Sequence, residues 1–148
     1  MGNVCDTYFY CLLPNHFHFL IRINEPESII IEYNKIKTGV APVSGDLFLS
    51  DFVMERFSNF LNAYAKAFNK MYYRKGGLFL DFTKRIIIKD DNLFTKMIHY
   101  IHANPDYHRL CQRIEDWKYS SYKSFLSDEP TKLLRKERWN YLAPKITS

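Results

Sequence analysis

Two histidines one residue apart are the first residues of this chain whose types and spacing can do chemistry. His16 and His18 flank Phe17 in a run of aromatic and apolar residues. Side chains alternate along a β-strand, so both imidazoles share one face, about 7 Å apart, and can bind one metal ion between them. Phe17 and Phe19 share the other face, where we expect them to anchor the strand on the core side. Two surface histidines on a half-buried hairpin are the simpler alternative.

The ligand types limit which metal such a pair can hold. Two imidazoles without cysteine argue against a closed structural zinc site and leave positions open for substrate oxygens and water. Imidazole fits Mn²⁺ better than Mg²⁺, and an open site of mixed nitrogen and oxygen ligands works with either ion.

A tyrosine and an asparagine four residues apart are the second candidate pair, Tyr100 and Asn104. On a helix they lie about 40° apart, on one edge of an apolar stripe, while His102 points about 160° away from Tyr100. A tyrosine hydroxyl beside a metal ion can attack a phosphodiester, because the metal offsets the developing charge. Asn104 can add an amide oxygen as a third metal ligand. The alternative is that Tyr100 packs in the core and Asn104 caps the helix.

The elements that must position these residues follow from hydrophobic patterns and turn residues. We predict strands over 7–13, 16–23 and 78–89, with Pro14-Asn15 turning the first two into a hairpin. We predict helices over 27–37, 51–73, 92–104 and 130–143. Ser50 is expected to cap the second helix and Asp90 or Asp91 the third, which Pro105 should stop.

Length and composition bound the class of protein. The 148 residues suit one domain, 1–148, with a packed core, and the net charge of +5 favours an anionic partner. Three cysteines without CxxC spacing indicate reduced thiols rather than disulfides. The chain opens with no leader pattern and has no apolar run long enough to cross a membrane, so we expect a soluble cytoplasmic protein.

Basic residues gather between positions 66 and 89, with one acid, Asp81, among them. Tyr72, Tyr73 and Phe79 are interleaved with the cations, an arrangement suited to phosphate contacts and base stacking. A solvated helix face and strand edge is the alternative. The candidate DNA-binding residues are Lys66, Lys70, Arg74, Lys75, Lys84, Arg85 and Lys89. We interpret a second cluster as a solvated face, namely Lys132, Arg135, Lys136 and Arg138.

Four stretches together resemble the Y1 HUH transposases of the IS200/IS605 type, in the branch of the REP-associated tyrosine transposases. Residues 10–21 look like the strand–PNH–strand segment of that family, and 68–79 like its FNK…G-LF stretch. Residues 100–105 look like its YIH-x-NP helix end, and 116–122 like its DW-x-YSSY signature. The resemblance covers about residues 7–127.

The resemblance implies an α+β fold, a ferredoxin-like antiparallel sheet with helices packed on it. It implies that His16, His18 and Asn104 hold Mg²⁺ or Mn²⁺ and that Tyr100 forms a 5′-phosphotyrosine with single-stranded DNA. The DNA would fold into hairpins and the enzyme, an endonuclease and strand transferase, would act at the bacterial nucleoid. Relatives include homodimers in which the tyrosine helix serves its own site or that of the partner.

One departure from the family concerns the start of the chain. Family members usually carry a strand and a helix before the histidine strand, whereas here the motif begins near residue 8. We therefore expect either a form shortened at its N-terminus or a numbering that starts inside a longer gene product. A lost first strand would leave a sheet edge open. The short N-terminus favours a rival hypothesis, a catalytically inactive or domesticated relative that binds nucleic acid. A hydrolase that uses a water nucleophile and dispenses with Tyr100 is a third hypothesis.

Overall fold

The computed structural model describes residues 4–38, 46–79, 83–127 and 131. They divide into two compact units, one formed by residues 1–5 and 23–86, the other by residues 6–22 and 87–148. Each unit is described by itself, and the prediction of a single domain stays a prediction. A two-stranded antiparallel sheet with helices confirms the α+β class for the described residues, whereas the ferredoxin-like arrangement stays a prediction.

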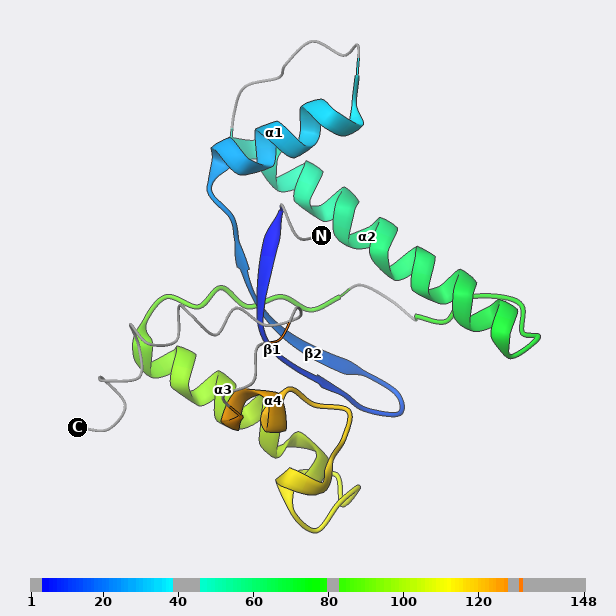
Figure 1. Cartoon of the computed structure of the whole chain (residues 1–148), viewed down its shortest axis with the longest axis vertical. Helices are drawn as coiled ribbons and strands as arrows, with labels where there is room; N and C mark the ends of the chain where they lie inside the picture. The colour runs from blue at the N-terminus through cyan, green and yellow to red at the C-terminus, as the bar shows by residue number, and fades with distance from the viewer. Residues whose placement is uncertain (1–3, 39–45, 80–82, 128–130, 132–148) are drawn as a thin grey trace. The chain divides into compact units, whose positions relative to one another are not determined.

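The predicted β-hairpin is present and carries the two histidines. Strand β1 (Cys5–Leu12) pairs with β2 (Phe17–Ile23). Pro14-Asn15 makes the turn, which the Leu13 N–H closes by donating to the His16 carbonyl oxygen at 2.8 Å. The other side of β1 forms an antiparallel bridge between Cys11 and Ser120. Figure 1 shows the hairpin beside α3 and α4, the helices that complete this unit.

Helix α3 (Asp91–Tyr107) starts where the sequence predicts and ends later. The carboxylate of its N-cap, Asp90, accepts a hydrogen bond from the Leu93 N–H at 2.7 Å. Pro105 lies inside the helix and does not stop it at residue 104, so that prediction is wrong. Proline in the last turn forfeits one backbone donor only, and the His108 N–H still donates to the Asn104 carbonyl oxygen at 3.0 Å. The chain then leaves the helix at Arg109, whose φ is 56°.

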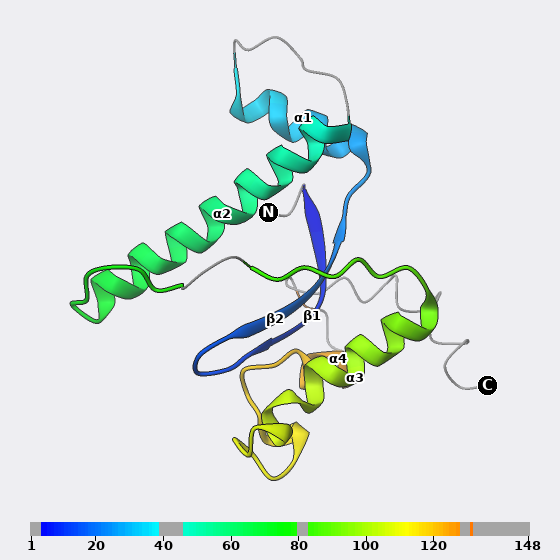
Figure 2. The ribbon, with the colours of Figure 1, turned by 180° about the vertical axis from the view of Figure 1, so that it is seen from behind.

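The core of this unit lies between the hairpin and α3. Its buried residues are Phe9, Cys11, Leu20 and Ile101. The Phe9 ring meets the rings of His102 and Phe125 edge-on, so α3 and the short helix α4 (Tyr122–Leu126) both pack on β1 (Figure 2). A 3₁₀ turn (Ile114–Asp116) links them. Cys5, Cys11 and Cys111 are free thiols, as predicted.

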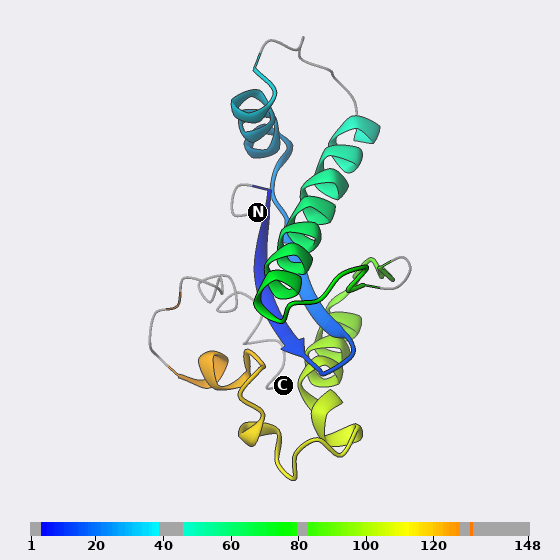
Figure 3. The ribbon, with the colours of Figure 1, turned by 90° about the vertical axis from the view of Figure 1, so that its right-hand side faces the viewer.

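The other unit pairs two helices. Helix α1 (Pro26–Ile36) packs against the first turns of α2 (Asp46–Met71), with Tyr33 between the rings of Phe48 and Phe52. The predicted cap Ser50 lies inside α2, because Phe48 and Leu49 pack on this cluster and extend the helix backwards. Figure 3 shows the C-terminal half of α2 continuing beyond α1. Tyr73, with φ of 52°, follows its end.

The predicted strand over 78–89 is absent from its described residues, 78–79 and 83–89. β-Branched residues favour a strand when neighbouring strands cover them, and here Ile86 and Ile87 are 70% and 78% exposed. The predicted helix over 130–143 and the second basic cluster lie outside the described residues, apart from Thr131. No helix in the described part of the chain has the length and apolar character needed to span a membrane.

Candidate active site

The hairpin places the two candidate metal-binding imidazoles side by side. The rings of His16 and His18 lie 5.0 Å apart between centroids. They share their strand face with Leu20, which is buried in the core against α3. Phe17 and Phe19 pack on each other at 5.2 Å and lie outside the buried cluster, so the expectation that they anchor the core side is wrong. The histidine face is the face that α3 covers.

Helix α3 brings Tyr100 and Asn104 to this histidine face. The Tyr100 ring meets the His18 ring edge-on, at a centroid distance of 5.2 Å. Tyr100 is 51% exposed, whereas Asn104 is buried with 3% exposure. The structure thus brings together all four residues that the sequence singles out, His16, His18, Tyr100 and Asn104.

Two buried polar atoms at this point have no hydrogen-bond partner in the part of the chain that the structure describes, His18 Nε2 and Asn104 Oδ1. A buried polar atom left unpaired costs about 1–3 kcal/mol, so such atoms need a reason. The Asn104 side chain raises the pKa of His18 as a hydrogen bond would, but neither atom meets a partner at hydrogen-bonding geometry within the described residues. An imidazole nitrogen and an amide oxygen are both metal ligands, so their donors fit a divalent cation.

The environment keeps His18 in a form that can bind metal. Burial lowers the pKa of His18 below its ordinary value, and the charges of His16 and His108 lower it further, while the Asn104 side chain raises it. His18 is therefore neutral near pH 7. The His16 Nδ1–H donates to Asn15 Oδ1 at 2.7 Å, so Nε2 is the ring nitrogen of His16 that remains for a metal. Such a bond orients a ligating ring.

The described residues hold no set of three or more His, Cys, Asp or Glu side chains arranged to bind a metal. The candidate site therefore consists of two imidazoles and one amide. A site with these three protein ligands is open, and its remaining positions suit water or phosphate oxygens.

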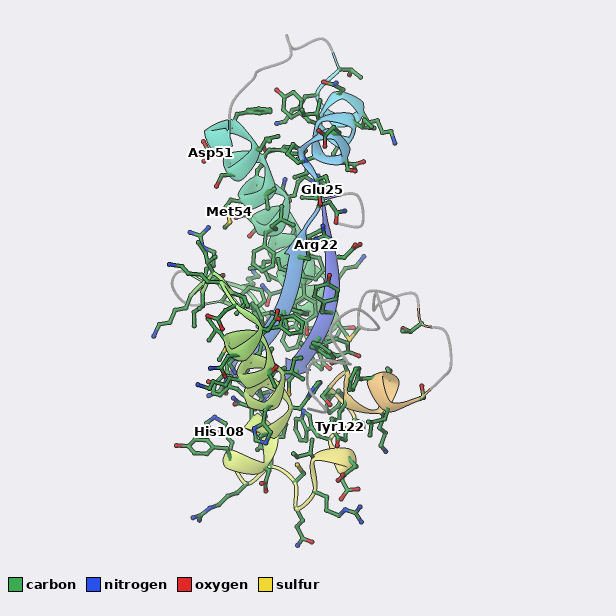
Figure 4. The ribbon with its side chains drawn as sticks, turned by 90° about the vertical axis from the view of Figure 1, so that its left-hand side faces the viewer. Arg22, Glu25, Asp51, Met54, His108 and Tyr122 are labelled. Carbon is green, nitrogen blue, oxygen red and sulfur yellow. The ribbon has the colours of Figure 1, made fainter. Side chains whose placement is uncertain are left out.

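Sequence reasoning missed His108, which lies at the end of α3 (Figure 4). Its ring is 5.3 Å from the His16 ring, and the Tyr107 ring is 5.4 Å from the His108 ring. The spacing was visible, because His108 follows Asn104 by four residues and Tyr100 by eight. A helix that stops at Pro105 gives residue 108 no helical register, so this spacing does not predict a place for His108 near the site.

His102, the histidine within residues 100–105, has a structural role. It is 3% exposed, and its ring packs on Phe9 and on Tyr122, which starts α4 (Figure 4). Its Nε2 lies 3.0 Å from the hydroxyl of Ser121. Burial lowers the pKa of His102 to about 4, so it is neutral at physiological pH. The prediction that His102 is no partner of Tyr100 is confirmed.

Ser121 ties the segment after α3 to strand β1. Its Oγ accepts from the Tyr10 N–H at 2.9 Å and lies 3.1 Å from the Tyr10 carbonyl oxygen and 3.0 Å from His102 Nε2. Nearby, the Trp117 indole N–H donates to the Leu12 carbonyl oxygen at 3.0 Å. The Asp-Trp…Ser-Ser-Tyr stretch therefore fastens α3, and with it Tyr100, to the histidine hairpin.

Replacement of Ser121 by alanine is expected to lower the free energy of unfolding by about 2–3 kcal/mol, because it leaves the Tyr10 N–H and His102 Nε2 without this partner. Urea denaturation followed by circular dichroism measures this. Ser120→Ala is the matched control, since the Ser120 hydroxyl makes two longer contacts of 3.3 Å. Equal losses in the two variants would contradict the assigned role of Ser121.

The seven candidate DNA-binding residues are all exposed. Six of them belong to the unit that contains α2, and Lys89 belongs to the other. Along α2 the rings of Phe68 and Tyr72 lie 4.5 Å apart, and the Arg74 guanidinium lies 5.7 Å from the centre of the Phe68 ring. Arg85 contacts the sulfur of Met54, a residue labelled in Figure 4. The end of α2 thus carries cations beside aromatic rings.

A comparison with known proteins adds one finding at this point. The chain is 27% identical over 120 residues to a curated protein of Haemophilus influenzae named "Putative REP-associated tyrosine transposase". The match covers 79% of this chain and 58% of that relative, and it supports a distant relation to that family. No family model and no solved structure matches the chain.

Proposed function

We propose that this chain cuts and rejoins single-stranded, hairpin-forming DNA through a covalent 5′-phosphotyrosine on Tyr100, with Mg²⁺ or Mn²⁺ bound beside it. The observation that carries the proposal is the contact of the Tyr100 ring with His18. Beside it lie two buried atoms without hydrogen-bond partners among the described residues, His18 Nε2 and Asn104 Oδ1. The transposase-like relative supports the same class of reaction.

The four site residues divide the work. His16, His18 and Asn104 would hold the cation, which when bound offsets negative charge on the phosphate. The Tyr100 oxygen forms a bond to phosphorus while the bond from phosphorus to the 3′ oxygen breaks. The upstream strand leaves with a 3′-hydroxyl, which takes up a proton from water as Tyr100 loses its own. The phosphodiester energy stays in the tyrosine ester, so rejoining needs no ATP.

Binding of the DNA falls to the exposed cations. Lys66 and Lys70 on α2, with Arg74 and Lys75 after it, suit phosphates, and the rings of Tyr64 and Tyr72 beside them suit unpaired bases. Lys84, Arg85 and Lys89 are further exposed cations of the same set. In a homodimer, Tyr100 would serve either its own histidines or those of a second copy.

A labelled-adduct experiment tests the proposal. The full chain is incubated with a library of oligonucleotides that carry a fixed hairpin and randomised flanks, in Mn²⁺, Mg²⁺ or EDTA. The covalent bond joins Tyr100 to the 5′ phosphate of the downstream fragment, so a fluorophore on the 3′ end should move with the protein on a denaturing gel. A fluorophore on the 5′ end should leave on a free fragment.

Other outcomes assign the other functions. DNA cleavage without any adduct would favour a hydrolase that uses water, and binding without cleavage in any metal would favour a nucleic-acid-binding relative. Adduct formation that is unchanged in EDTA would refute the metal site but keep Tyr100 as the nucleophile.

A further inference from the structure

An unbroken row of aromatic rings crosses the candidate site and ends on an exposed tyrosine. From Tyr100 the row passes to His18, to His16, to His108 and to Tyr107, with centroid distances of 5.2, 5.0, 5.3 and 5.4 Å. The reaction proposed above uses the first three members of this row and has no use for the last two.

Tyr107 has the exposure that a binding residue needs. It is 83% exposed at the last position of α3, and its contact with His108 is edge-to-face, with 87° between the ring planes. Such a contact leaves at least one face of the Tyr107 ring uncovered. The chain turns away at Arg109, which is itself an exposed cation.

Helix geometry places Tyr107 on the Tyr100 side of α3. Seven residues make almost two full turns and advance about 10.5 Å along the axis. Bases in a stacked strand are 3.4 Å apart, so a base on Tyr107 would lie about three nucleotides along the strand from the phosphate at Tyr100. Both side chains are exposed, Tyr107 to 83% and Tyr100 to 51%.

We infer that Tyr107 is a stacking platform for an unpaired base of the DNA strand that flanks the scissile phosphate. This inference rests on the proposed function for the location of that phosphate. The stacking itself needs neither metal nor cleavage. An aromatic ring stacks on any base and gives affinity without sequence preference, so a plain single strand is a sufficient probe.

The test compares four full-length proteins in EDTA: the unchanged chain, Tyr107→Ala, Tyr107→Phe and Tyr119→Ala. Fluorescence anisotropy measures their affinity for a 3′-fluorescein strand of twenty thymidines (dT20). Tyr107→Ala should bind about five- to a hundredfold more weakly, and Tyr107→Phe, which keeps the ring, about as well as the unchanged protein. Tyr119 is the matched control, because it is a half-exposed tyrosine of the same unit that packs on Trp117.

An abasic strand of equal length separates stacking from other effects. All four proteins should bind it alike, because it offers phosphates and no bases. An equal loss on both strands, or no loss on dT20 in Tyr107→Ala, would overturn the inference. So would a dimer, seen by sedimentation, that dissociates in Tyr107→Ala while DNA binding is kept, since a second copy would then cover the ring.

The two proposals can fail separately. Tyr107-dependent binding of dT20 without any covalent adduct would refute the nuclease and retain the stacking platform. If Tyr107→Ala changes neither the yield of the adduct nor the affinity for DNA, the stacking platform would be refuted and the nuclease retained.

Discussion

Tyr100→Phe is expected to abolish the covalent protein–DNA product, because it removes the only atom of that side chain that can attack phosphorus. The phenyl ring can keep the edge-on contact that the Tyr100 ring makes with His18 at 5.2 Å, so the fold and the DNA affinity should change little. A denaturing gel with a 3′-labelled strand measures the product, and anisotropy in EDTA measures binding.

The matched control for this loss is Tyr107→Phe. Tyr107 lies on the same side of α3 and is more exposed than Tyr100, 83% against 51%, so it is the neighbouring hydroxyl that could attack instead. Tyr107→Phe should keep the adduct. An adduct that survives Tyr100→Phe and disappears only when Tyr107 is also changed would assign the nucleophile to Tyr107.

The elements that the sequence predicts well are those that local interactions determine. The hairpin turn follows from Pro14-Asn15, whose closing hydrogen bond joins residues 13 and 16. The start of α3 follows from Asp90, because an aspartate can pair with the free N–H groups of the first turn. These preferences need no knowledge of the rest of the chain.

The errors arise where tertiary contacts decide. Ile86 and Ile87 suit a strand, but a strand needs a partner, and the described residues give them none in a sheet. Ser50 is a good cap in isolation, but Phe48 and Leu49 before it have a cluster to join. Pro105 predicts the end of a helix, but in the last turn of α3, where it is buried, it forfeits only one backbone donor.

The same error hid part of the site. Strand parity correctly put His16 and His18 on one face, and the four-residue step correctly put Asn104 near Tyr100. Parity alone could not tell which face α3 covers, so the phenylalanines were expected at the core. The extra helical turn after Pro105, which carries Tyr107 and His108, could not be found without knowing that Pro105 is buried.

Asn104 offers the sharpest prediction about the metal site, because its two possible roles affect the metal-free fold in opposite directions. Its Oδ1 is buried and has no hydrogen-bond partner among the described residues. If that oxygen waits for a cation, Asn104→Leu removes an unpaired polar atom and should raise the free energy of unfolding in EDTA by about 1–3 kcal/mol. If the amide instead pairs with His18 in the metal-free fold, the same change should destabilise the fold.

The metal-bound protein should respond in the opposite way. Mn²⁺ binding followed by electron paramagnetic resonance should detect a site in the unchanged chain, weakened at least about tenfold in His18→Ala and in Asn104→Leu. Asn104→Asp should bind Mn²⁺ more tightly, because a carboxylate adds charge to the oxygen ligand. Saturating Mn²⁺ should then stabilise the unchanged chain and Asn104→Asp against urea, but not the two weakened variants.

The control for these variants is His102→Ala, which removes an imidazole of the same helix that lies against Phe9 and Ser121 rather than the site. It should lose stability and keep its affinity for Mn²⁺ in the folded fraction. A loss of Mn²⁺ affinity in His102→Ala equal to that in His18→Ala would mean that any damage to α3 disturbs binding. An Asn104→Leu variant that is more stable but no longer binds Mn²⁺ would instead show that Asn104 Oδ1 destabilises the metal-free fold and serves to hold a cation beside Tyr100.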